Sequence, residues 1–98
     1  MSNKINAAIQ VLPLIANPRA YAIVDEAIAI ITNSGLHYEV CAFETTIDGT
    51  YEEIVVLLDK IRKHCLTTEA EEILINVKFS FKKSGDISMH DKIDKHRK

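Results

Sequence analysis

The segment YEVCAFETTIDG, residues 38–49, predicts two short strands that lie between two helical segments. The strands are expected to meet at Cys41-Ala42, and the Asp48-Gly49 pair is typical of a turn. Successive side chains of a strand point to opposite faces of the sheet. One face is therefore expected to bury Val40, Thr45 and Ile47, and the other to collect Glu39, Glu44, Thr46 and Asp48. Three carboxylates and a hydroxyl on one sheet face require a partner.

The segment before these strands has the apolar spacing of a helix. Asn17-Pro18 predicts its start, with the asparagine as cap and the proline at the first helical position, and Ser34-Gly35 predicts its end. Its only clearly charged residues are Asp25 and Glu26. Its apolar stripe consists of Ala20, Ile23, Val24, Ala27, Ile28 and Ile31, widened by Ala22, Ala29 and Ile30. Because apolar surface of this width is rarely left in water, we expect a second subunit against this helix.

The segment after the strands opens with a capping box, Thr50-Tyr51-Glu52-Glu53. In this motif the threonine side chain bonds a backbone N–H, and the glutamate three residues later reaches back. The helix that follows is expected to bury Ile54, Leu57, Leu58, Ile61 and Cys65. Its other side is rich in charged residues, which is typical of a solvated helix face.

Two outer strands are predicted from alternating hydrophobicity. Residues 5–12 separate Ile5, Ala7, Ile9 and Val11 from Asn6, Ala8, Gln10 and Leu12. Residues 72–82 separate Ile73, Ile75, Val77, Phe79 and Phe81 from Leu74, Asn76, Lys78, Ser80 and Lys82. The core is expected to contain Ile9, Val11, Val24, Ile28, Leu58, Ile61, Ile75 and Val77. Farther on, Ser88-x-x-Asp91 predicts the cap of a short basic helix in a docked or frayed tail.

The predicted order is strand, helix, strand, strand, helix, strand. With right-handed crossovers, this order gives an α+β fold of the ferredoxin-like βαββαβ type. It has one antiparallel sheet with two helices on one face, followed by the short C-terminal helix. A chain of 98 residues predicts a single domain, residues 1–98. The other sheet face has no cover of its own, so we expect it to pack on a partner sheet or to line a ligand cavity inside a dimer.

The composition narrows the class of function. A net charge of −2 and a sequence pI near 6.0 argue against a nucleic-acid binder, because such modules carry a basic excess on one face. No apolar run is long enough to span a membrane, and the N-terminus lacks the layout of a signal peptide. We therefore expect a cytoplasmic protein without a membrane partner. Cys41 and Cys65 lie far apart without a C-x-x-C motif, which predicts two reduced, structural thiols.

Neither a catalytic site nor a metal site is predicted. The four histidines include no pair at metal-ligand spacing and no nucleophile-base arrangement. Glu39 and Glu44 occur without an activated group or a phosphate-binding loop. We therefore expect a protein that is not an enzyme and that has no metal and no cofactor.

Three segments carry a resemblance to a known family: Ile9-Gln10-Val11-Leu12-Pro13, residues 34–38 and Phe43-Glu44-Thr45-Thr46-Ile47-Asp48-Gly49. They resemble the thiamine-binding protein family of the YkoF-like superfamily. The last strand and residues 87–97 extend the resemblance over nearly the whole chain. The resemblance implies a ferredoxin-like fold and dimers, commonly assembled into tetramers, whose sheets pair or face each other. It also implies binding of thiamine or its hydroxymethylpyrimidine part without catalysis.

The residues expected to bind this ligand share the uncovered sheet face or the central strands. They are Gln10, Glu39, Glu44, Thr45, Thr46, Asn76 and Lys78. Amide side chains can form hydrogen bonds with both the donor and the acceptor of an aminopyrimidine edge, and a carboxylate attracts a cationic thiazolium. One departure concerns the bend between the strands, where family members often have Gly-Pro and this chain has Cys41-Ala42. The freedom of glycine to approach a ligand closely is absent there.

Two other functions compete with ligand binding. Phe79 and Phe81 alternate as the aromatic residues of an RNA-binding sheet do, but they share the phase of Ile75 and Val77, which places them in the core. A regulatory or structural oligomer without any small ligand remains an open alternative. In that alternative, Glu44 and Lys78 are partners in an ion pair between subunits.

Overall fold

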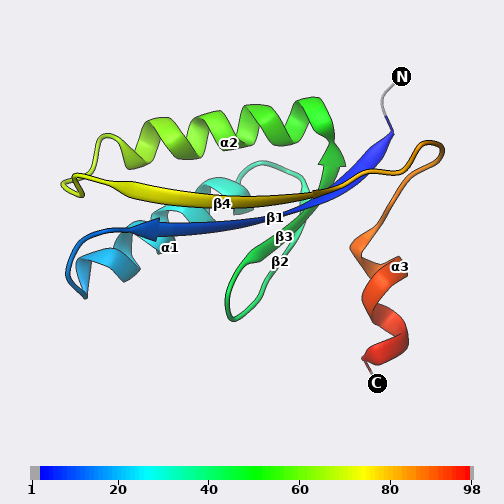
Figure 1. Ribbon diagram of the computed structural model, residues 1–98, viewed down its shortest axis with the longest axis horizontal. Coiled ribbons are helices and arrows are strands. Elements are labelled where there is room, and N and C mark those ends of the chain that lie inside the picture. Colours follow the sequence, from blue (N-terminus) through cyan, green and yellow to red (C-terminus); the bar gives the residue numbers. More distant parts are fainter. Residues whose placement is uncertain (1–2, 98) are drawn as a thin grey trace.

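The computed structural model describes residues 3–97 and confirms the predicted order of elements (Figure 1). The chain forms β1 (Lys4–Pro13), α1 (Arg19–Thr32), β2 (His37–Val40), β3 (Thr45–Thr50), α2 (Tyr51–Cys65), β4 (Ile73–Ser80), α3 (Met89–Ile93) and the 3-10 turn η1 (Asp94–His96). The strand order is β2-β3-β1-β4, and all neighbouring strands are antiparallel. This is the predicted α+β, ferredoxin-like fold.

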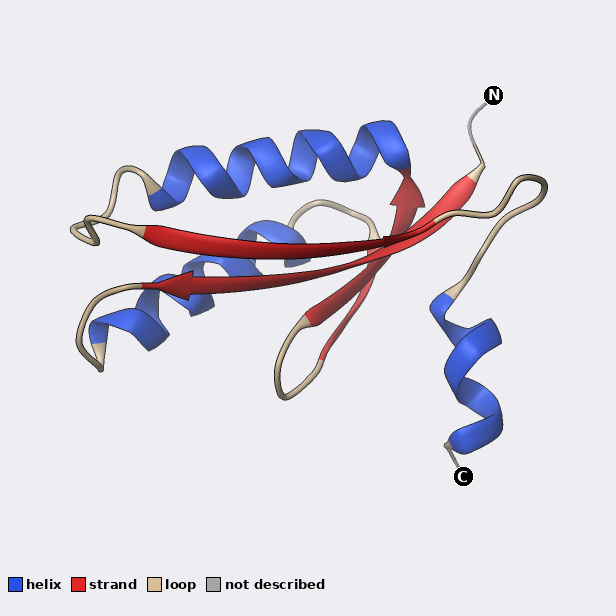
Figure 2. Ribbon diagram, viewed as in Figure 1, coloured by secondary structure: helices blue, strands red, loops and turns tan. Residues whose placement is uncertain are grey.

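The core lies between the sheet and the two long helices, while α3 stands apart from them (Figure 2). Ile9 and Val11 of β1 and Ile47 of β3 form one buried cluster with side chains from both helices. The helix members are Ile23, Ala27 and Ile31 of α1 and Leu57, Ile61 and Cys65 of α2. The apolar side chains that recur every two residues in the strands and every 3.6 residues in the helices therefore pack together on one side of the sheet.

The predicted capping box at the start of α2 is confirmed. The backbone N–H of Glu53 donates to Thr50 Oγ1 over 3.2 Å, and the backbone N–H of Thr50 donates to Glu53 Oε1 over 2.9 Å. Two backbone donors that the helix cannot satisfy by itself thus find partners. The cap fixes the point at which β3 ends and α2 begins.

The predicted start of α1 is wrong in detail. Pro18, not Asn17, occupies the cap position, and no side chain caps the helix. The carbonyl of Pro18 accepts the first helical bond from the N–H of Ala22 over 3.1 Å. The fixed φ of proline suits the entry to a helix, and Pro18 starts α1 although no side chain caps it.

The Asp48-Gly49 pair is not a turn, because β3 continues through both residues to Thr50. Gly49 leaves space for the Leu36 side chain and does not bend the chain. A Cβ atom at this position would lie 3.3 Å from Leu36 Cδ1 and 3.5 Å from Glu53 Oε1. The glycine thus lets the strand pass close to the segment that follows α1.

The predicted core residues fall into two groups. Ile9, Val11 and Ile61 are buried as predicted. Leu58, Ile75 and Val77 are only half-buried, although they pack against the core cluster. Val24 and Ile28 are half-buried as well. A two-layer sandwich of this size has few positions that are enclosed from every side, so its outer helix and strand positions keep contact with solvent.

Val40 and Phe81 were expected in the core, and the structure places both at the surface. Val40 is 50% exposed because it ends β2, an edge strand of the sheet. Phe81 is 63% exposed because β4 ends at Ser80, and its ring stacks on that of Phe79 with centroids 5.6 Å apart. Phe79 itself packs against the core beside Ile5, so it lies on the helix side as predicted.

Cys41 and Cys65 are both free, as predicted, but Cys41 is exposed. Burial raises the pKa of the Cys65 thiol. Among residues 3–97, no helix has the length and apolar character needed to cross a membrane.

Candidate functional site

The open face, meaning the sheet face away from α1 and α2, aligns polar side chains across all four strands. Ala8 of β1 lies opposite Thr46 of β3 on one side and opposite Lys78 of β4 on the other. Glu39 of β2 lies opposite Thr46. Glu39, Thr46, Ala8 and Lys78 therefore form one polar row across the sheet, with one residue from each strand. The alternation predicted for this face is confirmed in β1 and β4.

A second group of polar side chains lies beside this row. Asn76 Nδ2 donates to Gln10 Oε1 over 3.2 Å, so the two amides satisfy part of each other's bonding capacity. Glu44 lies in the loop between β2 and β3, and its Oε1 is 3.5 Å from Lys78 Nζ. The Lys78 side chain is 79% exposed, so this ion pair contributes little to stability. Both charges remain accessible to a ligand.

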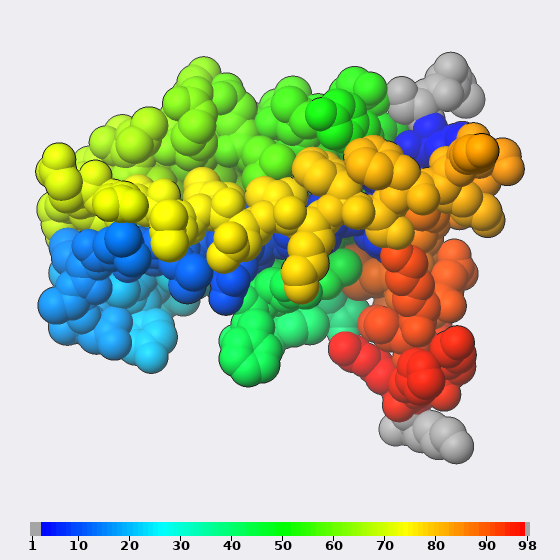
Figure 3. Space-filling view, in the orientation of Figure 1, coloured from blue at the N-terminus to red at the C-terminus, as the bar shows by residue number. Residues whose placement is uncertain are grey.

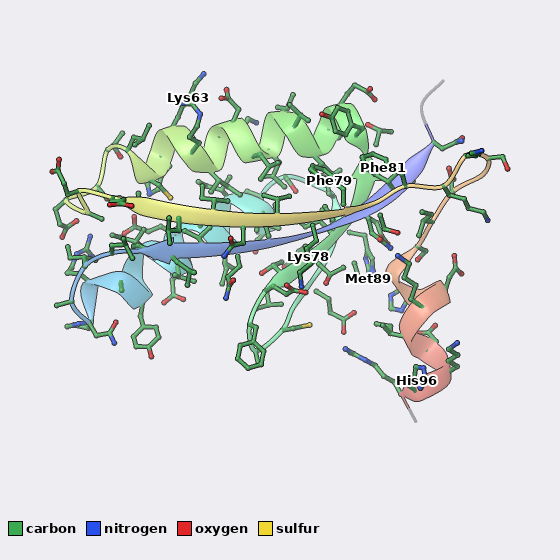
Figure 4. The ribbon with its side chains drawn as sticks, in the orientation of Figure 1. Lys63, Lys78, Phe79, Phe81, Met89 and His96 are labelled. Carbon is green, nitrogen blue, oxygen red and sulfur yellow. The ribbon has the colours of Figure 1, made fainter. Side chains whose placement is uncertain are left out.

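The tip of the β2–β3 hairpin and Lys78 enclose a shallow depression of about 560 Å³. Its lining residues are Gln10, Cys41, Ala42, Phe43, Glu44 and Lys78. Figure 4 shows Lys78 reaching from β4 toward the hairpin. Phe43 is 82% exposed at this rim, which is unusual for a large aromatic side chain. The depression therefore combines an aromatic wall, a carboxylate, an amide and an ammonium group.

Glu39 is engaged by the C-terminal tail. Its carboxylate accepts a hydrogen bond from the Arg97 guanidinium, and the attraction of this carboxylate raises the pKa of Arg97. No sequence pattern indicates this pairing, because it depends on where the tail lies. Glu39 is thus held at one end of the polar row rather than pointing freely at the depression.

Thr45 lies on the opposite side of the sheet from the other candidate ligand residues. It is 4% exposed, and it follows the phase of Ile47, which faces the helices. Thr46 is the threonine of the pair that belongs to the open face. The seven predicted ligand residues therefore divide between two faces that meet at the hairpin tip.

The prediction that the open face has no cover of its own is wrong at one end, where α3 docks. Met89, 2% exposed, donates its backbone N–H to both Asp48 carboxylate oxygens over 3.1 and 3.2 Å. Ser88 Oγ adds a bond of 3.3 Å to Asp48. Lys92 Nζ donates to Asn6 Oδ1 over 3.0 Å and to Ser80 Oγ over 2.7 Å. Asp48 is consequently buried under the start of α3, where Figure 4 labels Met89.

Replacing this anchor should release the tail. Asp48→Ala leaves the buried N–H of Met89 without an acceptor, which costs about 1 to 3 kcal/mol. We expect amide hydrogen exchange in residues 87–93 to accelerate by the corresponding factor, while the exchange of α2 stays unchanged. Asp25→Ala, an exposed carboxylate on α1, is the matched control. Equal protection of residues 87–93 in wild type and Asp48→Ala would contradict the docking role of Asp48.

The tail also brings two histidines together that are far apart in the sequence. The Nε2 atoms of His37 and His90 lie 3.0 Å apart, and His90 Nδ1 lies 2.9 Å from Asp94 Oδ1. The hydrogen bond to Asp94 raises the pKa of His90. No group of three or more histidine, cysteine, aspartate or glutamate side chains within residues 3–97 has the arrangement to hold a metal ion.

Comparison with known proteins gives a consistent family assignment. The family model described as "Thiamine-binding protein" matches residues 7–97. A UPF0045 protein of Clostridium perfringens is 32% identical over 92 residues, which cover 94% of this chain and 96% of that protein.

Solved structures agree in fold over almost the whole chain. A domain of unknown function, DUF77, from Bacillus cereus has a TM-score of 0.90 and 29% identity and covers 99% of this chain and 93% of its own. A candidate thiamine biosynthesis/salvage protein from Thermotoga maritima has a TM-score of 0.89 and 28% identity, with coverages of 96% and 99%. Sequence and structure together show that the chain belongs to the thiamine-binding protein family.

Proposed function

We propose that this protein binds thiamine, or its hydroxymethylpyrimidine part, without catalysing a reaction, as a homo-oligomer of one domain that spans residues 1–98. The observation that carries the proposal is the depression at the hairpin tip, where Gln10, Glu44 and Lys78 from separate segments converge beside exposed Phe43. Membership of the thiamine-binding protein family supports the choice of ligand class. The Thermotoga maritima relative, a candidate thiamine biosynthesis/salvage protein, supports it as well.

The charges of the depression suit a ligand with a flat, polar ring and a cationic part. Glu44 is the carboxylate that a thiazolium cation would meet, because its side chain is 34% exposed and its present partner, Lys78, is held only at 3.5 Å. Phe43 offers an aromatic face to the same cation. Gln10, Thr46 and Asn76 supply neutral donors and acceptors on the open face, and an adjacent subunit would close the site.

Shape and surface favour an oligomer. The chain exposes 6516 Å², whereas a compact monomer of 11.0 kDa is expected to expose about 5,600 Å². Its extents of 42 × 34 × 20 Å describe a flat, two-layer molecule. Exposed large apolar side chains near the hairpin and the open face include Leu12, Tyr21, Val40, Phe43 and Leu74. Exposed apolar surface of this kind is typical of a subunit that packs against a neighbour.

We therefore expect light scattering at micromolar concentration to give a mass of at least a dimer, with a tetramer as the fuller assembly. Phe43→Ser and Leu74→Ser should lower the mass if the open face and hairpin tip form the interface. Val55→Ser, which changes an exposed apolar residue of α2, serves as the control. A stable monomer of 11 kDa would contradict the prediction.

A direct test of function is a thermal-shift panel with thiamine, its phosphates and hydroxymethylpyrimidine, followed by calorimetry. A ligand that binds only the folded protein stabilises it, by about 2.7 kcal/mol when the ligand concentration is 100 times its dissociation constant. The melting temperature rises as a result. We expect thiamine or hydroxymethylpyrimidine to produce a saturable shift. No heat and no shift at millimolar ligand would reject the binding function.

The second candidate function is a structural or regulatory oligomer without a small ligand. The pairs Glu44–Lys78 and Glu39–Arg97 favour it, because each neutralises a candidate ligand carboxylate within the chain itself. In this function the open face would serve only as a contact between subunits. The response of Glu44 variants, considered below, separates the two functions.

A further inference from the structure

The C-terminal tail, residues 87–97, covers a second row of polar side chains that crosses the whole sheet. Asn6 of β1 lies opposite Ser80 of β4 on one side and opposite Asp48 of β3 on the other. His37 of β2 lies opposite Asp48. Side chains directly opposite each other on antiparallel strands point to the same face of the sheet, so these four form one row on the open face. We call it the covered row.

Every side chain of the covered row has a hydrogen-bonding partner in the tail. Three of them bond to Lys92 and to the start of α3, as described above. The fourth contact joins His90 of α3 to His37 of β2. The tail buries only Ile87 and Met89, and Figure 3 shows it, coloured orange to red, as a lobe that projects from one end of the sheet. Because so little apolar surface holds the tail, its docking depends on the polar contacts.

The histidine pair is the contact that depends on protons. A hydrogen bond between two ring nitrogens needs one N–H and one bare nitrogen. His90 Nδ1 lies 2.9 Å from the Asp94 carboxylate, which accepts hydrogen bonds, so Nδ1 carries a proton. His90 Nε2 then either accepts from His37 or, when the ring is cationic, donates to it. The pair therefore keeps its hydrogen bond when it is neutral and when it carries one added proton.

A second added proton removes this hydrogen bond. Both Nε2 atoms then carry a hydrogen, so two donors and two positive charges face each other across 3.0 Å. In the released tail the two rings are separate, and each takes up a proton at about pH 6.5, as an ordinary histidine does. The released form therefore binds up to one more proton than the docked form in mildly acid solution, which makes the docking equilibrium depend on pH.

We propose that the His37–His90 pair is a pH-sensitive latch, which keeps the tail docked on the covered row near neutral pH and releases it when both rings are protonated. Release uncovers the row and also withdraws Arg97 from Glu39, because Arg97 belongs to the same tail. It thus removes a cation from the end of β2 and frees a carboxylate on the open face. The latch needs no ligand, so it does not rest on the binding of thiamine.

The charges around His90 favour one added proton on the pair. The hydrogen bond to Asp94 raises the pKa of His90, and Glu39 of β2 and Asp48 of β3 attract the same cation. Because this pKa is raised in the docked form, its contribution to docking is complete below about pH 6.5 and is lost as the pH rises through the raised pKa. Docking is therefore strongest when the pair carries one proton. The other charged or titratable groups of the tail are Lys92, bonded to uncharged side chains of β1 and β4, Arg97, bonded to Glu39, Asp91, bonded to the N–H of Ser88, and Lys95 and His96.

Amide hydrogen exchange of wild-type protein tests the latch directly. Protection factors of residues 88–93, each relative to the unstructured rate at the same pH, should fall roughly tenfold between about pH 6.5 and pH 5.0, because release takes up a further proton. Carboxylates ordinarily protonate at about pH 4, so this range isolates the histidines. Protection of α2 should stay constant. A tail that is unprotected at neutral pH, or protected equally at both pH values, would overturn the proposal.

Histidine variants assign the effect to the pair. His37→Gln keeps a side chain that can donate and accept but removes one titrating ring. The tail of this variant should stay docked in mildly acid solution, because its release no longer takes up a further proton. His96→Gln, the matched control, removes an exposed histidine that Figure 4 places near the far end of the tail, and it should keep the wild-type fall. An equal fall in His37→Gln and wild type, or its loss in His96→Gln, would reject the pair as the latch.

A titration followed by nuclear magnetic resonance needs no variant and so does not depend on whether a variant folds. The ring Cε1–H resonances of His37 and His90 should titrate in two coupled steps, since each ring senses the charge of the other. The amide resonance of Met89, which reports its hydrogen bond to Asp48, should move with the second step as the tail leaves. Independent titration of the two rings with an unmoved Met89 amide would show that protonation does not release the tail, and the latch would be wrong.

Discussion

Ile47→Ala is expected to lower the free energy of unfolding by about 2 to 5 kcal/mol, the range found when a large buried side chain is truncated. Ile47 is fully buried, and it packs in the cluster that joins β1 and β3 to both long helices. The surrounding elements cannot close the resulting cavity without moving a helix. Urea denaturation without added ligand, at the same protein concentration for both proteins, measures the change in the free energy of unfolding.

Two further variants set the scale for this result. Ile75→Ala truncates a half-buried residue of β4, so its cost should fall at or below the lower end of the same range. Val56→Ala, at a 56% exposed position of α2, should change stability by less than about 0.5 kcal/mol. If Ile47→Ala cost no more than Val56→Ala, the assignment of the central strand to the core would be rejected.

Glu44→Gln is expected to weaken binding of thiamine by about 1.5 to 3 kcal/mol, the contribution of a hydrogen bond to a charged group. The change keeps the size and the acceptor oxygen of the side chain but removes the charge that a thiazolium would meet. The oligomer should stay intact, because the exposed pair with Lys78 stabilises little. Calorimetry measures the affinity and light scattering measures the assembly.

Controls decide between the two functions that the open face supports. Glu71→Gln removes a charge from an exposed residue remote from the hairpin tip and should alter neither affinity nor mass. Lys78→Met removes the partner of Glu44 and should preserve or strengthen the binding of a cation. If Glu44→Gln instead dissociated the oligomer and left ligand affinity unchanged, Glu44 would be part of a structural contact between subunits.

The elements that the sequence predicted well are those whose pattern is local. The alternation of β1 and the apolar spacing of α2 depend only on the repeat of each backbone conformation. The capping boxes at Thr50 and Ser88 are local as well, since each links residues three positions apart. Charged and polar positions such as Gln10, Thr46 and Lys78 were placed on the open face for the same reason.

Errors arose where a local signal had two physical causes. The Asp48-Gly49 pair has the composition of a turn, but both residues lie within β3, where the Leu36 side chain packs beside Gly49. Phe81 continues the alternation of β4, but the strand ends before it at Ser80. A pattern states which side a residue would face within a strand and does not state where the strand stops.

By itself, the sequence determined the order of elements, the phase of the strands and the polar character of the open face, because these follow from backbone periodicity. Only the tertiary structure decided that α3 covers Asp48, that Arg97 engages Glu39 and that β3 begins opposite Ile9. Each of these depends on contacts between segments remote in the chain, whose geometry no local pattern encodes.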